Sequence, residues 1–144
     1  MNREIARALE WDCTQVLYRF FYLFDQFLYD DAAGLFAPDG VWNRQGKALR
    51  GPAQVVAAMN QRSTTQTVRH VVTNVLVTAI DEATAEMVLY LTAYQYDSGT
   101  KAATPPTIRS PSLLLVVPGR LVKTGGDWRI AEMTMNREFV FPPA

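Results

Sequence analysis

Histidine and cysteine are each present only once in this chain of 144 residues, as His70 and Cys13. A lone cysteine excludes a disulfide within the chain and fits a reducing compartment, so we expect a cytoplasmic protein. One histidine and one cysteine do not supply the ligands of a typical zinc or iron site. We therefore predict that the protein binds no metal.

An excess of charge of either sign is also absent, because 14 Lys and Arg balance 14 Asp and Glu. Since there is no polybasic run, we expect no nucleic-acid partner. The longest apolar stretch, residues 16–29, is interrupted by Arg19, Asp25 and Gln26, and the N-terminus has no basic-then-apolar signal pattern. We expect neither a membrane span nor a secretory signal.

What the chain does have is enough apolar residues to fold. Apolar residues make up 49% and charged residues 19%, a balance that is typical of a packed globule and not of a disordered chain. The length predicts one domain over residues 1–144. No repeat, linker or low-complexity segment divides the sequence.

The first half of the chain has helical patterns. Residues 4–29 carry polar side chains on one face and aromatic ones opposite, at spacings of three and four. Asp30 and Asp31 are typical of a helix start. The elements expected here are a long helix over 4–29, a short helix over 31–37, a hairpin of 41–44 with 47–50, and a helix from 51 to about 62 that begins at Gly51-Pro52.

The second half has strand patterns. Residues 67–80 alternate, and one face is expected to hold Val68, His70, Val72, Asn74, Leu76 and Ile80. Three further strands are expected over 83–96, 113–122 and 128–140, with a bulge or kink at Pro118-Gly119. Helices on one face of an antiparallel sheet make an α+β fold, and a strongly curved sheet around a long helix leaves a pocket.

Asp25 is the most unusual residue of the first helix, because it is a carboxylate among aromatic rings. At about 100° per residue it lies on the flank of the helix, beside Tyr18 and Phe21. That position suits a residue at the edge of a cavity, but it also suits a half-exposed carboxylate. A lone His70 on an apolar strand face is equally open to a core role with backbone hydrogen bonds.

The order of these elements resembles the nuclear transport factor 2-like superfamily. The resemblance rests on the segments from Phe36 to Trp42 (FAPDGVW), Gly51-Pro52, Val68 to Asn74 (VRHVVTN) and Gly126 to Ile130 (GDWRI). The branch that it resembles most is the SnoaL-like group, near scytalone dehydratase and hexachlorocyclohexane dehydrochlorinase. The resemblance implies a cone-shaped α+β fold, with a pocket between the first helix and a strongly curved antiparallel sheet.

The resemblance also implies a site. In the dehydratase and dehydrochlorinase members, an aspartate of the first helix pairs with a histidine of the first long strand, and Asp25 and His70 fall on these positions. Other positions differ, since Phe24, Ala93 and Phe20 stand where those members have a tyrosine, a second histidine and a lysine. These departures argue against either named activity but leave the pair in place.

The first hypothesis is a cofactor-independent lyase, dehydratase or isomerase that acts on a small hydrophobic molecule, cyclic or aromatic. His70 would be the general base and acid, and Asp25 would orient it. No metal and no organic cofactor is implied. The residues expected to line the substrate pocket are Tyr18, Phe21, Trp42 and Asn74.

Three alternatives remain. Asp25 could itself be the base, as in ketosteroid isomerase-like members, or the same pair could catalyse polyketide cyclase-like aldol chemistry. The fold also serves as a non-catalytic ligand binder or as a structural subunit, for example the small subunit of ring-hydroxylating dioxygenases. In each case we expect a homodimer or homotrimer. The outer face expected to pair contains Thr84, Val88, Tyr90, Thr92 and Tyr94.

Overall fold

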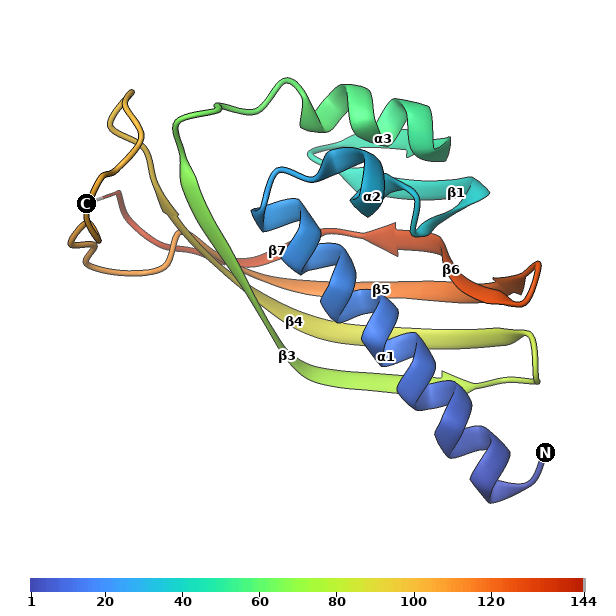
Figure 1. Cartoon of the computed structure of the whole chain (residues 1–144). Helices are drawn as coiled ribbons and strands as arrows, with labels where there is room; N and C mark the ends of the chain where they lie inside the picture. Colours follow the sequence, from blue (N-terminus) through green and yellow to red (C-terminus); the bar gives the residue numbers. More distant parts are fainter. Residues whose placement is uncertain (144) are drawn as a thin grey trace.

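The structure is a computed structural model that describes residues 1–143. Helices and strands alternate in blocks along these residues (Figure 1). In chain order they are α1 (Arg3–Asp25), α2 (Tyr29–Ala33), β1 (Phe36–Arg44), β2 (Lys47–Arg50), α3 (Gly51–Met59), β3 (Thr67–Ala79), β4 (Thr84–Tyr96), β5 (Leu113–Thr124), β6 (Asp127–Thr134) and β7 (Asn136–Val140).

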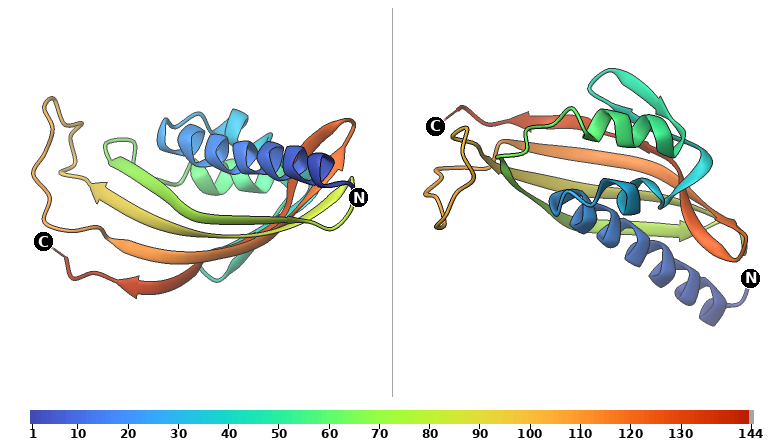
Figure 2. Two further views of the ribbon diagram at one scale, coloured as in Figure 1. Left: turned by 90° about the horizontal axis from the view of Figure 1, so that it is seen from below. Right: turned by 45° about the horizontal axis from the view of Figure 1, so that its top comes forward.

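The strands form one 7-stranded sheet in the order β2-β1-β6-β5-β4-β3, with β7 paired to β5. All neighbours are antiparallel except β1 and β6, which run parallel, so the sheet is mixed and not purely antiparallel as expected. Figure 2 shows the sheet curling around the helices, which all lie on one side of it. The α+β class and the curled sheet around a long helix are confirmed.

Helix α1 is fixed at its start by a side-chain cap and along its length by an apolar stripe. The side-chain oxygen of Asn2 accepts hydrogen bonds from the N–H groups of Glu4 and Ile5. Seven apolar residues at spacings of one, three and four are buried against the sheet: Leu9, Cys13, Val16, Leu17, Phe20, Phe21 and Phe24. This stripe holds α1 across β3 and leaves Asp25 as the last residue of the helix.

The predicted helix ends were wrong by several residues. Helix α1 ends at Asp25 and not at residue 29, because Phe27 takes a left-handed conformation with φ 61°. Helix α2 then spans 29–33 and not 31–37. Asp30 and Asp31 lie in its first turn, and Leu28 holds the cap position without a side-chain hydrogen bond.

Strand β3 contains a bulge that changes which residues face the core. The pairing of β3 with β4 shifts between Thr73 and Leu76, and Asn74 has φ 51°. Before the bulge Val68, His70 and Val72 face inwards, and after it Val75, Val77 and Ala79 do so. Leu76 and Ile80 are therefore exposed, at 62% and 54%, against the prediction of one continuous face.

The last predicted strand, 128–140, is two strands. Its pairing with β5 is interrupted at Met135, whose N–H donates to the carbonyl of Asn43. As a result β6 and β7 pair with two successive parts of the same edge of β5. The expected irregularity at Pro118-Gly119 lies beside a register shift between Arg120 and Leu121.

Within residues 1–143, no helix combines the length and the apolar character that a membrane crossing requires. In the same residues, no three His, Cys, Asp or Glu side chains gather closely enough to hold a metal ion.

Candidate active site

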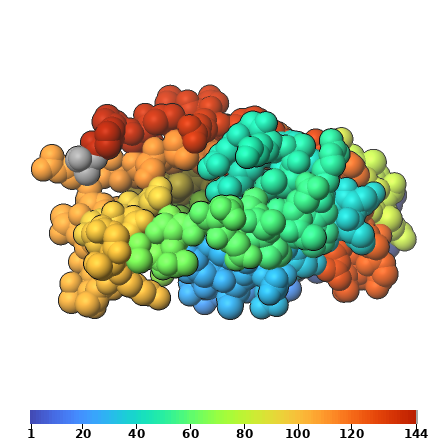
Figure 3. Space-filling model, turned by 90° about the horizontal axis from the view of Figure 1, so that it is seen from above, coloured from blue at the N-terminus to red at the C-terminus, as the bar shows by residue number. Residues whose placement is uncertain are grey.

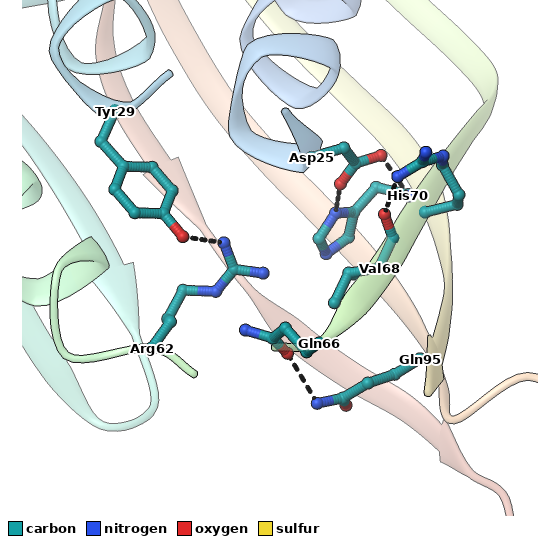
Figure 4. A network of polar contacts seen from close by, with 8 residues as sticks. Asp25, Tyr29, Arg62, Gln66, Val68, His70 and Gln95 are labelled. Atoms are coloured by element: carbon teal, nitrogen blue, oxygen red, sulfur yellow. Dashed lines mark hydrogen bonds and ion pairs between the residues drawn. The ribbon is translucent and has the colours of Figure 1, made fainter. Parts of the chain in front are cut away.

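Asp25 and His70 lie in direct contact at the junction of α1 and β3. Asp25 Oδ1 is 2.5 Å from His70 Nδ1, and Asp25 Oδ2 accepts a hydrogen bond from the backbone N–H of His70 at 2.8 Å. Both side chains are largely buried, with 6% of Asp25 and 10% of His70 exposed. The carboxylate therefore binds one residue with both oxygens and fixes the plane of the ring (Figure 4).

The position of Asp25 explains why it needs this partner. A carboxylate in the last turn of a helix faces the negative end of the helix dipole, and α1 has no basic residue there. Burial adds to the unfavourable free energy of the charge. The two N–H donors of His70 offset both effects, because hydrogen bonds to a charged acceptor are about twice as strong as neutral ones.

Aromatic side chains of α1 hold the His70 ring from the helix side. The ring centroids of Phe24 and Phe21 lie 5.1 Å and 5.7 Å from that of His70. Phe24 packs in turn on Phe20 and Trp42. With Nδ1 on the carboxylate, these contacts leave Nε2 as the ring nitrogen available to another molecule.

His70 lies in the wall of a cavity of about 820 Å³. The cavity is bounded by the turn between β1 and β2, the α3–β3 connection and strands β3, β4, β5 and β7. Its apolar lining includes Val68, Leu113, Leu115 and Met135. Figure 3 shows the molecule hollowed between the α3–β3 connection and the C-terminal strand. A volume of this size accommodates a small organic molecule.

Polar side chains gather beside His70 in this cavity. Arg62 donates from Nη1 to the hydroxyl of Tyr29 at 2.9 Å, and its guanidinium carbon lies 4.0 Å from the Phe24 ring centroid. Gln95 donates from Nε2 to Oε1 of Gln66, also at 2.9 Å. In Figure 4, Arg62 and Gln66 both point into the space on the Nε2 side of His70.

Two arginines of the cavity, Arg44 and Arg62, have lowered pKa values. Burial lowers the pKa of Arg62 from its ordinary value, and Tyr29 and Asp25 act in the opposite direction. Burial also lowers the pKa of Arg44, and the like charge of Arg62 lowers it further.

The structure brings Asp25 and His70 together but places the four expected lining residues outside the 820 Å³ cavity. Tyr18 and Phe21 border a smaller depression of about 450 Å³, which Asp25 and His70 also line. Trp42 is fully buried and packs behind Phe24 and Phe20. Asn74 is exposed, because the bulge of β3 turns the strand at that residue. Among the described residues, none of these four lines the large cavity.

Sequence reasoning missed the polar residues Arg62, Gln66 and Gln95. A signal was present for Gln66, because residues 66, 68 and 70 share one strand face at a period of two. Gln95 is paired with Val68 across β3 and β4, so its side chain lies on that same face. The third helix was predicted to continue to about residue 62, but α3 ends at Met59 and Arg62 lies in the irregular connection after it, where no periodic pattern predicts the direction of a side chain.

Comparison with known proteins identifies the family. A family model for a SnoaL-like domain matches residues 7–134. No curated protein matches the chain.

Solved structures share the fold at low identity. A candidate scytalone dehydratase from Novosphingobium aromaticivorans has 14% identity and a TM-score of 0.76, covering 90% of this chain and 84% of that one. A type 2 hexachlorocyclohexane dehydrochlorinase has 15% identity and a TM-score of 0.76, covering 96% and 91%. ActVI-ORFA from Streptomyces coelicolor has 12% identity and a TM-score of 0.74, covering 91% and 98%.

At these identities the likeness concerns the fold. The family model matches most of the chain and therefore shows the family as well as the fold. This match agrees with the helices and the curled sheet described above. The chain belongs to the SnoaL-like family of the nuclear transport factor 2-like superfamily.

Proposed function

We propose that the protein is a cofactor-independent lyase, of the dehydratase type, or an isomerase, in which His70 transfers protons to and from a small hydrophobic substrate. The observation that carries the proposal is the Asp25–His70 contact of 2.5 Å, with His70 in the wall of an 820 Å³ cavity. The partly apolar lining of the cavity suits a ring or a short carbon skeleton.

In the proposed mechanism, Asp25 keeps the proton of His70 on Nδ1, so that Nε2 presents a lone pair to the cavity. Nε2 removes a proton from a substrate carbon, and the electron pair of that C–H bond forms the new double bond. The leaving group, such as hydroxide, departs from the adjacent carbon and takes the proton back from Nε2 as water. For an isomerase, the proton returns to a different carbon. General acid–base catalysis of this kind contributes roughly 10²–10⁴-fold to the rate.

Asp25 is a poor candidate for the base itself, because both of its oxygens are engaged by His70. Aldol cyclisation makes the same demand for proton transfer and is a variant of the proposal. The similar proteins named as a dehydrochlorinase and a candidate scytalone dehydratase support elimination chemistry. The departures at Phe20, Phe24 and Ala93 favour a substrate different from those of these two proteins.

The test is deuterium exchange, which needs no knowledge of the leaving group. The protein is incubated in D₂O with cyclic ketones and cyclic β-hydroxy acids, and loss of the C–H signal and formation of alkene are followed by proton NMR. We expect His70→Ala to lower the rate roughly 10²–10⁴-fold and Asp25→Asn to lower it as well. The control Arg7→Gln, on the exposed start of α1, leaves the rate unchanged.

Wild-type rates in both His70→Ala and Asp25→Asn would remove the mechanism. Tight binding of panel members without any exchange or elimination in the wild type would favour the alternative of a non-catalytic ligand-binding module.

A further inference from the structure

The cavity beside His70 is cationic. Arg44, Arg62 and Arg137 line it, and no Asp or Glu is among its lining residues. Within residues 1–143, the ion pairs are His70 with Asp25 and Arg129 with Asp127, so neither Arg44 nor Arg62 has a carboxylate partner there. Two partly buried like charges without a carboxylate in direct contact are unfavourable. An anion bound between them would remove that penalty.

Arg62 is held in one position before any ligand arrives. Its guanidinium lies against the Phe24 ring, with the rings of Phe27 and Tyr29 each 5.7 Å from the guanidinium carbon. Only Nη1 is engaged in a hydrogen bond, to Tyr29. Since a guanidinium carries five N–H donors in a planar fork, donors remain for a planar acceptor such as a carboxylate.

Gln66 adds a second donor with a fixed direction. Its side chain is 5% exposed, and its Oε1 already accepts the hydrogen bond from Gln95. The amide nitrogen is therefore the end of Gln66 that faces the cavity, toward Arg62 (Figure 4). An amide nitrogen only donates, so Arg62 and Gln66 both present N–H donors to this part of the cavity.

We propose that the ligand of this cavity is an organic anion: a ring or short hydrophobic skeleton with a carboxylate, which Arg62 and Gln66 bind. Arg44, which also lines the cavity, adds electrostatic attraction. The inference builds on the proposed function, to which it adds the substrate class, carboxylic acids. The skeleton would lie on Val68, Leu113 and Leu115, with a carbon near the carboxylate facing His70.

The test compares two probes of the same shape, 2-naphthoate and 2-naphthamide, by isothermal titration calorimetry at neutral pH. The wild type is expected to bind the carboxylate about tenfold more tightly or better, since hydrogen bonds to charged groups are the strong ones. Arg62→Gln should reduce this preference to about threefold or less, and Arg62→Lys should retain part of it, because it keeps the charge but loses the fork. Arg7→Gln is the matched control and should behave as the wild type.

Equal affinity for the two probes in the wild type would overturn the inference, and so would an unchanged preference in folded Arg62→Gln. The same holds if benzoate, cyclohexanecarboxylate and 2-naphthoate all fail to bind at millimolar concentration. Should Arg62→Gln fail to fold, as judged by circular dichroism, Gln66→Leu replaces it with the same expected loss of preference.

His70→Gln separates this inference from the proposed function. It should retain the preference for 2-naphthoate while losing deuterium exchange. A wild type that prefers the carboxylate but exchanges no deuterium would leave the anion site standing and sink the catalytic proposal.

Discussion

At the scale of single residues, the main feature is the carboxylate of Asp25, which contacts His70 with both of its oxygens. Asp25 binds the ring and the backbone N–H of His70, so helix α1 and strand β3 are joined at the point where the cavity begins. Each contact restrains the other, because the backbone N–H holds Oδ2 and so fixes the carboxylate whose Oδ1 the ring contacts. In the proposed mechanism, such a support holds the base in place without help from a substrate.

Cys13 provides a prediction about a residue outside the site. Its side chain is fully buried, and burial, with Asp12 and Glu10 nearby, raises the pKa of its thiol to about 12. The native protein should therefore not react with 5,5′-dithiobis(2-nitrobenzoate) at pH 8, whereas the protein unfolded in guanidinium should release one equivalent of thionitrobenzoate. Rapid stoichiometric labelling of the native protein would contradict this.

The same raised pKa predicts a pH dependence of stability. Below the ordinary thiol pKa of 9.0 both the folded and the unfolded state hold the proton, so Cys13 does not change stability with pH. Between about 9 and 12 only the unfolded state releases it, so the free energy of unfolding should fall over this range. Cys13→Ala should show a smaller fall in urea titrations, and an equal fall in both proteins would count against the assignment.

The candidate site could be predicted only in part from the sequence. Asp25 and His70 could be placed, because each stands out from an apolar pattern and matches a family position. Trp42 was wrongly predicted to line the cavity. The sequence around an aromatic residue does not show whether its ring lines a cavity or packs in the core behind the lining. Arg62 could not be found, because the direction of a side chain in an irregular connection depends on packing between segments far apart in the sequence.

At the scale of elements, local breaks in the helices and strands determine which side chains line the cavity. Elements themselves follow from periodicity, and β4, β5 and the hairpin of β1 and β2 lie close to where the sequence predicts them. The breaks at Phe27, Asn74 and Met135 were missed, because none has the glycine or proline that usually marks an interruption. Each one is imposed by tertiary packing, and the break at Asn74 moved Asn74 itself out of the predicted site.

The bulge of β3 can be tested at Asn74, whose φ of 51° is unfavourable for a β-branched side chain. Asn74→Gly should leave the free energy of unfolding within about 0.5 kcal/mol or raise it. Asn74→Val should lower it by about 1–2 kcal/mol, because valine in the left-handed region is strained. Urea unfolding measures both, and Thr78→Val, at an exposed position of the same strand, is the control. Equal stability of the glycine and valine variants would contradict the bulge.

At the scale of the whole molecule, the two faces of the sheet differ in what covers them. The helices cover the inner face, while the outer face carries exposed apolar residues from neighbouring strands, and among the described residues no helix covers it. Those on β3 and β4 include Val71, Tyr90 and Tyr94, and Phe139 of β7 pairs with Leu114 of β5. An apolar surface that spans several strands is typical of an interface.

We propose that this outer face pairs with a second copy of the chain, in a homodimer or homotrimer. Sedimentation velocity at micromolar concentration should show the wild type as an oligomer. Tyr90→Lys should shift it towards the monomer, whereas Tyr22→Lys, on the exposed side of α1, should not. A monomeric wild type, or the same oligomer in Tyr90→Lys, would contradict the proposal.

The most direct test of the central claim, that Asp25 holds His70 ready to accept a proton at Nε2, is the ¹⁵N NMR spectrum of the ring. Because His70 is the single histidine of the chain, its two ring nitrogens can be observed without assignment. In the neutral ring we predict a protonated Nδ1, bound to Asp25, and an unprotonated Nε2. A proton on Nε2, or rapid exchange between the two tautomers, would contradict the account.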